Sequence, residues 1–243
     1  MQRSTLLPVR RALLAGGAVL VLGASALGVG AYSYLKPTAA ASGPIEAIPL
    51  TVNTTLLSDD AADTSTSSVY DIQSSASDAS FTINEVLSGS PKTVVGTTDQ
   101  VAGQIALDPD DTSTAQVGTI LIDARTLATD DSARNQALRN LILNSNQYEY
   151  ITFTPTDISG LPDSLALGQS YPFQISGDLS IAGVTQPAVF KATLTRITDD
   201  TLEGSASTTI NYADWGVSIP SVPFMASVDN QVSLNLDFQA VAS

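Results

Sequence analysis

The sequence predicts a mainly β domain: an antiparallel β-barrel of about eight strands with one short helix, behind an N-terminal apolar helix and a flexible linker. Three observations carry this prediction. From residue 69 onward, apolar and polar residues alternate in many short segments, and only one segment has helical periodicity. Near the N-terminus, a long run of residues carries no charge. Because a β-sandwich shows the same alternation, that architecture stays open.

The alternating segments define the predicted strands. Residues 171–181 are apolar at most odd positions, and residues 202–212 and 232–238 are apolar at most even positions. Such a strand has one dry and one wet face, which favours antiparallel pairing. The same pattern recurs, more briefly, around residues 81–83, 101–107, 120–122, 151–153 and 190–194. Turn signals separate the segments at Ser90-Pro91, Asp108-Pro109-Asp110, Ala182-Gly183, Asp199-Asp200 and Asp229-Asn230.

Residues 130–147 form the one segment with helical periodicity. Asp131 or Ser132 can cap its start, and Asn144 or Asn146 can end it. We expect this helix to lie at one mouth of the barrel. Its apolar stripe comprises Ala137, Leu138, Leu141 and Ile142.

The N-terminal sequence predicts that most of the protein lies outside the cytoplasm. Residues 12–35 are 24 residues without a charge, which span about 36 Å as a helix, enough for a hydrocarbon core. The basic residues of 1–11 are expected to stay cytoplasmic, so 12–35 is predicted to be a transmembrane signal anchor. Small residues at 24–26 and 31–33 also resemble signal-peptide cleavage sites, so a secreted or periplasmic form remains the alternative.

Residues 36–68 are predicted to be a flexible linker, because they are rich in small, polar and acidic residues. The barrel domain is predicted to occupy residues 69–243. We therefore expect a single-pass membrane protein whose barrel lies on the outer side.

Composition excludes several kinds of function. The sequence has no cysteine and no histidine, which removes thiol chemistry, His-based triads and His-ligated metals. Residues 1–36 carry a charge of +4, and the remainder has six basic against 24 acidic side chains, a net charge of −18. So acidic a surface repels phosphate backbones, so no nucleic-acid partner is expected. The acidic stretch 108–113 lacks the glycine and glutamate of a calcium loop, and no metal site is predicted.

Several segments, in matching order, resemble the YceI-like family of polyisoprenoid-binding β-barrels of the bacterial periplasm. Residues 175–194, ISGDLSIAGVTQPAVFKATL, resemble it most closely. The resemblance covers about residues 69–241, through the segments 69–83, 101–108, 120–140, 148–160, 175–194 and 210–217. The family's histidine positions have no counterpart, because the sequence has no histidine.

This resemblance implies a lipocalin-like barrel that sequesters an isoprenoid lipid or a quinone tail in its interior, without chemistry and without a cofactor. It also implies that a homodimer is a possible assembly. The residues expected to line the interior are Phe81, Ile83, Ile105, Ile122, Phe153, Phe173, Ile175, Leu179, Phe190, Leu194, Ile210, Tyr212, Trp215, Leu234 and Leu236. The residues expected at the mouth or lid are Arg134, Leu138, Leu141 and Ile142.

Two other functions stay open. The same apolar side chains could fill the interior, which would leave a ligandless structural or interaction module at the cell surface. An enzyme would need a buried carboxylate pair or a lysine with a perturbed pKa inside the barrel. Lys191 lies on the wet face of its strand, so we expect no catalytic residue and no enzyme.

Overall fold

The computed structural model describes residues 43–50, 67–220 and 225–243. The chain divides into two units, Met1–Pro37 and Thr38–Ser243, and every described residue belongs to the second. The predicted stub at 1–11 and anchor at 12–35 lie outside the described residues, as does most of the linker. Within the part that is described, no helix has the length and apolar character needed to cross a membrane.

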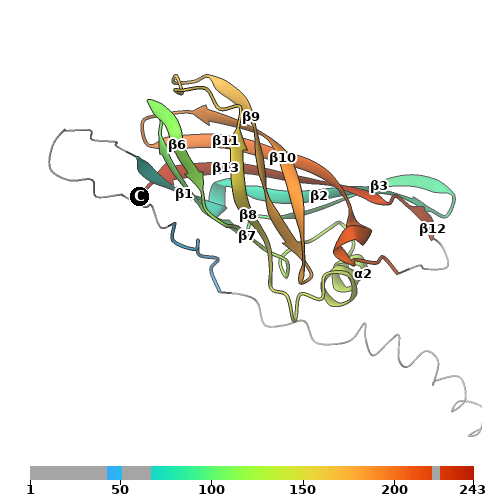
Figure 1. Ribbon diagram of the computed structural model, residues 1–243. Coiled ribbons are helices and arrows are strands. Elements are labelled where there is room, and N and C mark those ends of the chain that lie inside the picture. Colours follow the sequence, from blue (N-terminus) through green and yellow to red (C-terminus); the bar gives the residue numbers. More distant parts are fainter. Residues whose placement is uncertain (1–42, 51–66, 221–224) are drawn as a thin grey trace, which may run out of the picture. The chain divides into compact units, whose positions relative to one another are not determined.

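The described part of residues 67–243 is mainly β, with one short helix, as predicted (Figure 1). Its strands are β1 (Ser68–Ile72), β2 (Asp78–Leu87), β3 (Ser90–Thr98), β4 (Val101–Ala102), β5 (Gln104–Asp108), β6 (Asp111–Val117), β7 (Ile120–Asp123), β8 (Tyr150–Ser159), β9 (Ser170–Ile181), β10 (Val184–Arg196), β11 (Thr201–Asn211), β12 (Met225–Val228) and β13 (Gln231–Ala242). The helical elements are η1 (Ser74–Ala76), α2 (Ser132–Ala137), the π-helical turn η2 (Leu138–Ile142) and η3 (Tyr212–Trp215).

These strands form one antiparallel sheet that curls as a half-barrel, so two separate layers are not what the described residues build (Figure 1). The order along the sheet is β4-β7-β8-β9-β10-β11-β13-β1-β5-β6, and β2 pairs with β3, β12 and β13. Only Gly103 separates β4 from β5, yet β4 pairs with β7 and β5 pairs with β1. The two strands are therefore consecutive in the chain, with the bend at Gly103 between them, but they belong to opposite flanks of the sheet.

Tight turns join the long strands, mostly where the sequence predicts them. Ala182 and Gly183 connect β9 to β10 with φ angles of 50° and 81°, as a two-residue hairpin turn requires. The β2–β3 turn is different: it lies at Ser88 and Gly89, with φ angles of 49° and 81°. The predicted turn at Ser90-Pro91 is wrong by two residues, because Pro91 sits inside β3, near its first residue, where a proline is tolerated.

The predicted helix is shorter than 130–147. Asp131 caps α2 by accepting the backbone N–H of Arg134, and Asn144 ends the segment with a φ of 46°. Between them the chain widens into the π-helical turn η2. A π turn shifts the angular position of the residues that follow, so the predicted apolar stripe is broken. Leu138 is buried, whereas Leu141 is 37% exposed and faces away from the core.

Candidate functional site

The apolar faces of the strands lie on one side of the curled sheet, here called the inner face. One cross-strand row shows its character: Ala79 on β2 pairs with Leu236 on β13, which pairs with Ala206 on β11, which pairs with Ala192 on β10. Three of these four side chains are methyl groups. The side chains at this level are therefore small: Ala79 and Ala192 are buried, whereas Ala206 and Leu236 are half-buried.

Burial along the inner face falls into three stretches. At one end Leu202 and Ala240, which are register partners, are completely buried. At the other end Ile210 and Val232 are buried as well. Between these packed rows, six inner-face residues are only half-buried, namely Phe81, Ala206, Thr208, Leu234, Leu236 and Phe238, whereas their neighbours Ala79 and Ala192 are buried. Leu202 and Ile210 are eight residues apart on β11, so the half-buried stretch lies between rows about 26 Å apart.

The structure places all fifteen predicted lining residues in one hydrophobic cluster. The buried members are Ile83, Ile105, Phe153, Ile175, Leu179, Phe190, Leu194, Ile210 and Trp215. The half-buried members are Phe81, Ile122, Phe173, Tyr212, Leu234 and Leu236. The rings of Phe153 and Phe190 pack edge to face, with centroids 4.8 Å apart. The fifteen residues therefore differ in how far solvent reaches them, which the sequence alone does not show.

The predicted lining omits Phe238, which shares the inner face with Leu236 and is half-buried. Its alternation with Leu234 and Leu236 was the signal that could have identified it. Its register partner Gly204 was not identifiable from the sequence, because register between β11 and β13 is a long-range property.

Trp215 closes the end of the inner face beyond Ile210. It belongs to η3, which Asn211 caps by accepting the N–H of Ala213 and which ends at Gly216 with a φ of 68°. The indole is buried, and its Nε1–H donates to the carbonyl oxygen of Leu179 at 2.9 Å. Packing and the hydrogen bond together hold this side chain in place.

Four alternating charges join α2 to the β2–β3 hairpin. Arg134 contacts Glu85 of β2 at 3.0 Å and Asp130 at 2.7 Å, and Asp130 also contacts Lys92 of β3 at 3.0 Å. Glu85 continues the inner-face alternation of β2, and its side chain is only 10% exposed. The hydrogen bond from Lys92, with help from Arg134, lowers the pKa of Asp130. Because Arg134 bonds two carboxylates, it fixes the helix to the hairpin, and its positive charge is already balanced within the protein.

Other polar groups near the core have structural partners. Asp123, which is fully buried, accepts the backbone N–H of Arg125 and closes the turn after β7. Tyr70 is buried at the packed end, where burial raises the pKa of its phenol, and its hydroxyl donates to the carbonyl oxygen of Asp199. In the part of the chain that the structure describes, no cluster of three or more acidic side chains is arranged to hold a metal ion.

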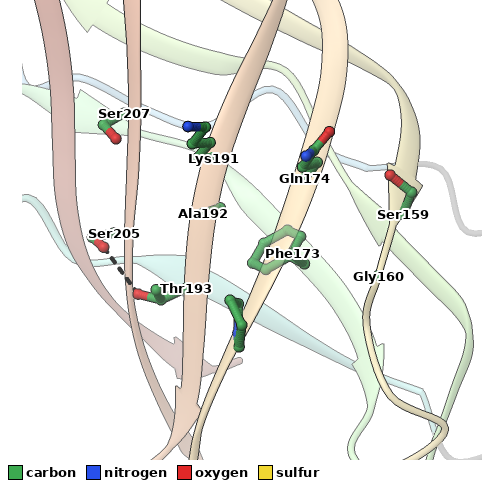
Figure 2. A pocket seen from close by; sticks show the side chains of 10 residues that line it. Ser159, Gly160, Phe173, Gln174, Lys191, Ala192, Thr193, Ser205 and Ser207 are labelled. Carbon is green, nitrogen blue, oxygen red and sulfur yellow. Dashed lines mark hydrogen bonds between the residues drawn. The ribbon is translucent and has the colours of Figure 1, made fainter.

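A groove of about 580 Å³ lies on the opposite, outer face of the sheet, across β9, β10 and β11 (Figure 2). Lys191 is exposed there, which confirms its predicted place on the wet face. Thr193 and Ser205 share a hydrogen bond of 2.9 Å in the same groove. Its lining residues are Ser159, Gly160, Pro172, Phe173, Gln174, Lys191, Ala192, Thr193, Ser205 and Ser207. Most polar side chains that line this groove are exposed to solvent. Apart from the Thr193–Ser205 hydrogen bond, they are not arranged around a common point.

Comparisons with known proteins agree with this architecture. BcnA of Burkholderia cenocepacia has the same fold, with a TM-score of 0.55, 16% identity, and coverage of 70% of this chain and 99% of that one. A polyisoprenoid binding domain from Saccharophagus degradans, implicated in plant cell wall breakdown, gives a TM-score of 0.55, 17% identity, and coverage of 72% and 98%. A comparison with curated proteins gave no match.

The family model of the YceI-like domain matches residues 70–240, from the third residue of β1 to near the end of β13. The matched stretch contains the whole curled sheet except its outermost residues, and it contains every residue of the predicted lining. The chain therefore belongs to the YceI-like family.

Proposed function

We propose that this protein binds an isoprenoid lipid, or the isoprenoid tail of a quinone, along the half-buried middle of its inner face. The observation that carries the proposal is that five inward-facing apolar side chains stay half-buried between two packed rows: Phe81 on β2, Ala206 on β11, and Leu234, Leu236 and Phe238 on β13. A hydrocarbon tail would remove this surface from water, and each buried CH₂ contributes about 0.8 kcal/mol. The relative from Saccharophagus degradans, described as a polyisoprenoid binding domain, supports the same ligand class.

The sheet is proposed to work as a lipocalin-like barrel of eight strands. Two pairings support this: β4 with β7 and β5 with β1, on either side of Gly103. If β4 and β5 act as one bent strand, the pairing runs around a closed ring. Closure would enclose the ligand on all sides and leave entry to the ends.

The protein is also proposed to hold its ligand without reacting with it. Among the described residues, the buried carboxylate of Asp123 serves a turn, and the lining is hydrocarbon and aromatic apart from the polar groups of Tyr212, Trp215 and Thr208. A prenyl chain would therefore meet mainly hydrocarbon on this wall.

Residues 12–35 are proposed to hold the domain at the outer side of the cytoplasmic membrane, close to the bilayer that stores such lipids. The uncharged run and the arginines before it support this. The intact mass of the protein recovered from membranes tests it. A full-length mass in the membrane fraction is expected, whereas a shortened chain in the soluble fraction would favour cleavage.

The lipid proposal is tested by extraction of the purified full chain, produced in a bacterium rich in prenyl lipids, followed by mass spectrometry. Ala206→Phe would fill the middle of the inner face, and Ser207→Phe, at the next position, points to the outer face as a matched control. We expect a prenyl species with the wild type and the control, and little with Ala206→Phe. Wild-type protein that is repeatedly empty, or equal occupancy in Ala206→Phe, would refute the proposal.

A further inference from the structure

Gly96 of β3 lies under an aromatic ring. It is the register partner of Phe81 on β2, is buried, and does not adopt a positive φ, so its backbone conformation is open to any residue. Space explains the glycine instead. A Cβ at this position would lie 2.5 Å from Cζ of Phe81, and the three atoms nearest to it all belong to that ring.

The Phe81 ring lies flat against the backbone of Gly96, a position that we call its seat. On its other side, its register partner on β13 is Leu234, whose side chain also projects from the inner face. If a methyl group occupied position 96, the ring would have to leave the wall. With a leucine on one side and a methyl group on the other, the direction left to it is the half-buried middle of the inner face.

Gly204 under Phe238 shows why Gly96 is the informative position. A Cβ at Gly204 would lie 2.5 Å from Cζ of Phe238, but also 2.6 Å from the backbone carbonyl oxygen of Thr193. That glycine is therefore required by the backbone as well as by the ring. At Gly96, the nearest atoms belong to the ring alone, so a substitution there moves one side chain.

We propose that Gly96 is a specificity-determining residue: by seating the Phe81 ring against β3, it keeps the inner face clear for a slender prenyl chain. The inference rests on the proposed function and deepens it. Because the ring lies flat against the glycine, it leaves room on the inner face for a linear, methyl-branched run of isoprene units.

The seat itself is tested without a lipid, by thermal unfolding of the lipid-stripped full chain. At an unstrained site, Gly→Ala stabilises a protein through its unfolded state. Gly96→Ala is therefore expected to lower the melting temperature in the wild type and to raise it by about 1–4 °C in the Phe81→Leu background. A rise in both backgrounds would mean that the ring does not occupy the seat.

The role in binding is tested by native mass spectrometry of the same proteins with farnesol, geranylgeraniol and solanesol. A displaced ring that excludes about two chain methylenes weakens binding roughly tenfold. We expect Gly96→Ala to lose solanesol to that extent, Gly96→Ala/Phe81→Leu to regain it, and Val95→Ala, an exposed neighbour on β3, to match the wild type.

The outcomes separate the two proposals. Wild-type binding that Gly96→Ala leaves unchanged would overturn the role of Gly96 and leave the lipid function intact. A wild type that binds none of the three alcohols would overturn both, even where the melting temperatures confirm the seat. Loss and rescue of binding together with the reversal of sign in stability support the proposal.

Discussion

The inner face contains two regions that share their chemistry and differ in their packing. Around Leu202, Ala240 and Tyr70, side chains are at most 1% exposed. On the same strands or their neighbours, the equally apolar side chains of Ala206, Leu236 and Phe81 remain half-buried. The first region accounts for itself as a core. The second is equally apolar but less tightly packed, which is the surface that the proposed lipid would cover.

The largest contrast is expected in stability. Leu202→Ala removes a fully buried side chain from the packed end and should cost about 2–5 kcal/mol of unfolding free energy. Leu236→Ala, in the half-buried middle, should cost only about 1 kcal/mol, because little surrounding packing is lost. Denaturant unfolding of the lipid-free chain measures both. Equal costs would mean that the middle is packed as tightly as the end.

A second, smaller effect concerns the contact that fixes α2 on the β2–β3 hairpin. Arg134→Ala leaves the 10% exposed side chain of Glu85 without its ion-pair partner, and the nearest remaining cation is its register partner Lys92, which bonds Asp130. We expect a loss of about 1–3 kcal/mol, reduced from the value for a fully buried pair because Arg134 and Asp130 reach solvent.

The double variant Glu85→Ala/Arg134→Ala removes both charges and serves as the control. It should cost less than Arg134→Ala alone. If the two variants are equally stable, the cost reflects lost packing of the arginine stem and not an unpaired carboxylate.

The smallest effect is a dependence on pH. The hydrogen bond from Lys92 lowers the pKa of Asp130 below its ordinary value of 3.8. A carboxylate with a lowered pKa in the folded state stabilises that state above its ordinary pKa, and this contribution is lost as the pH falls through the lowered value. Amide hydrogen exchange in α2 should therefore differ between wild type and Asp130→Asn at neutral pH and converge in acid. A difference that persists in strong acid would assign the effect to another group.

Alternation predicted the β class, most strands and the cluster of lining residues. It did so because one face of each strand is dry, and such a face is visible in a single sequence. It failed at β3 (Ser90–Thr98) and β6 (Asp111–Val117), whose residues are mostly polar, and at the β2–β3 turn, where Ser88 and Gly89 carry no strong signal.

The candidate site was predictable only as a set of apolar residues. Whether Phe81 fills a core or lines a space depends on its neighbours Gly96 and Leu234, which come from two other strands. Similarly, Leu141 was expected on the apolar side of its helix, but the π-helical turn η2 rotates it toward solvent. Register and local helix geometry are set by tertiary packing, so periodicity alone does not contain them.

Thiol labelling tests the difference between the two regions most directly, because the chain has no cysteine of its own. Ala206→Cys places a thiol in the half-buried middle, and Ala240→Cys places one in the packed end of the same inner face. We expect a small maleimide to modify Ala206→Cys quickly, solanesol to protect that thiol, and Ala240→Cys to stay unmodified in the folded protein. If the two thiols are equally unreactive, the interior is filled by its own side chains and has no room for a lipid tail.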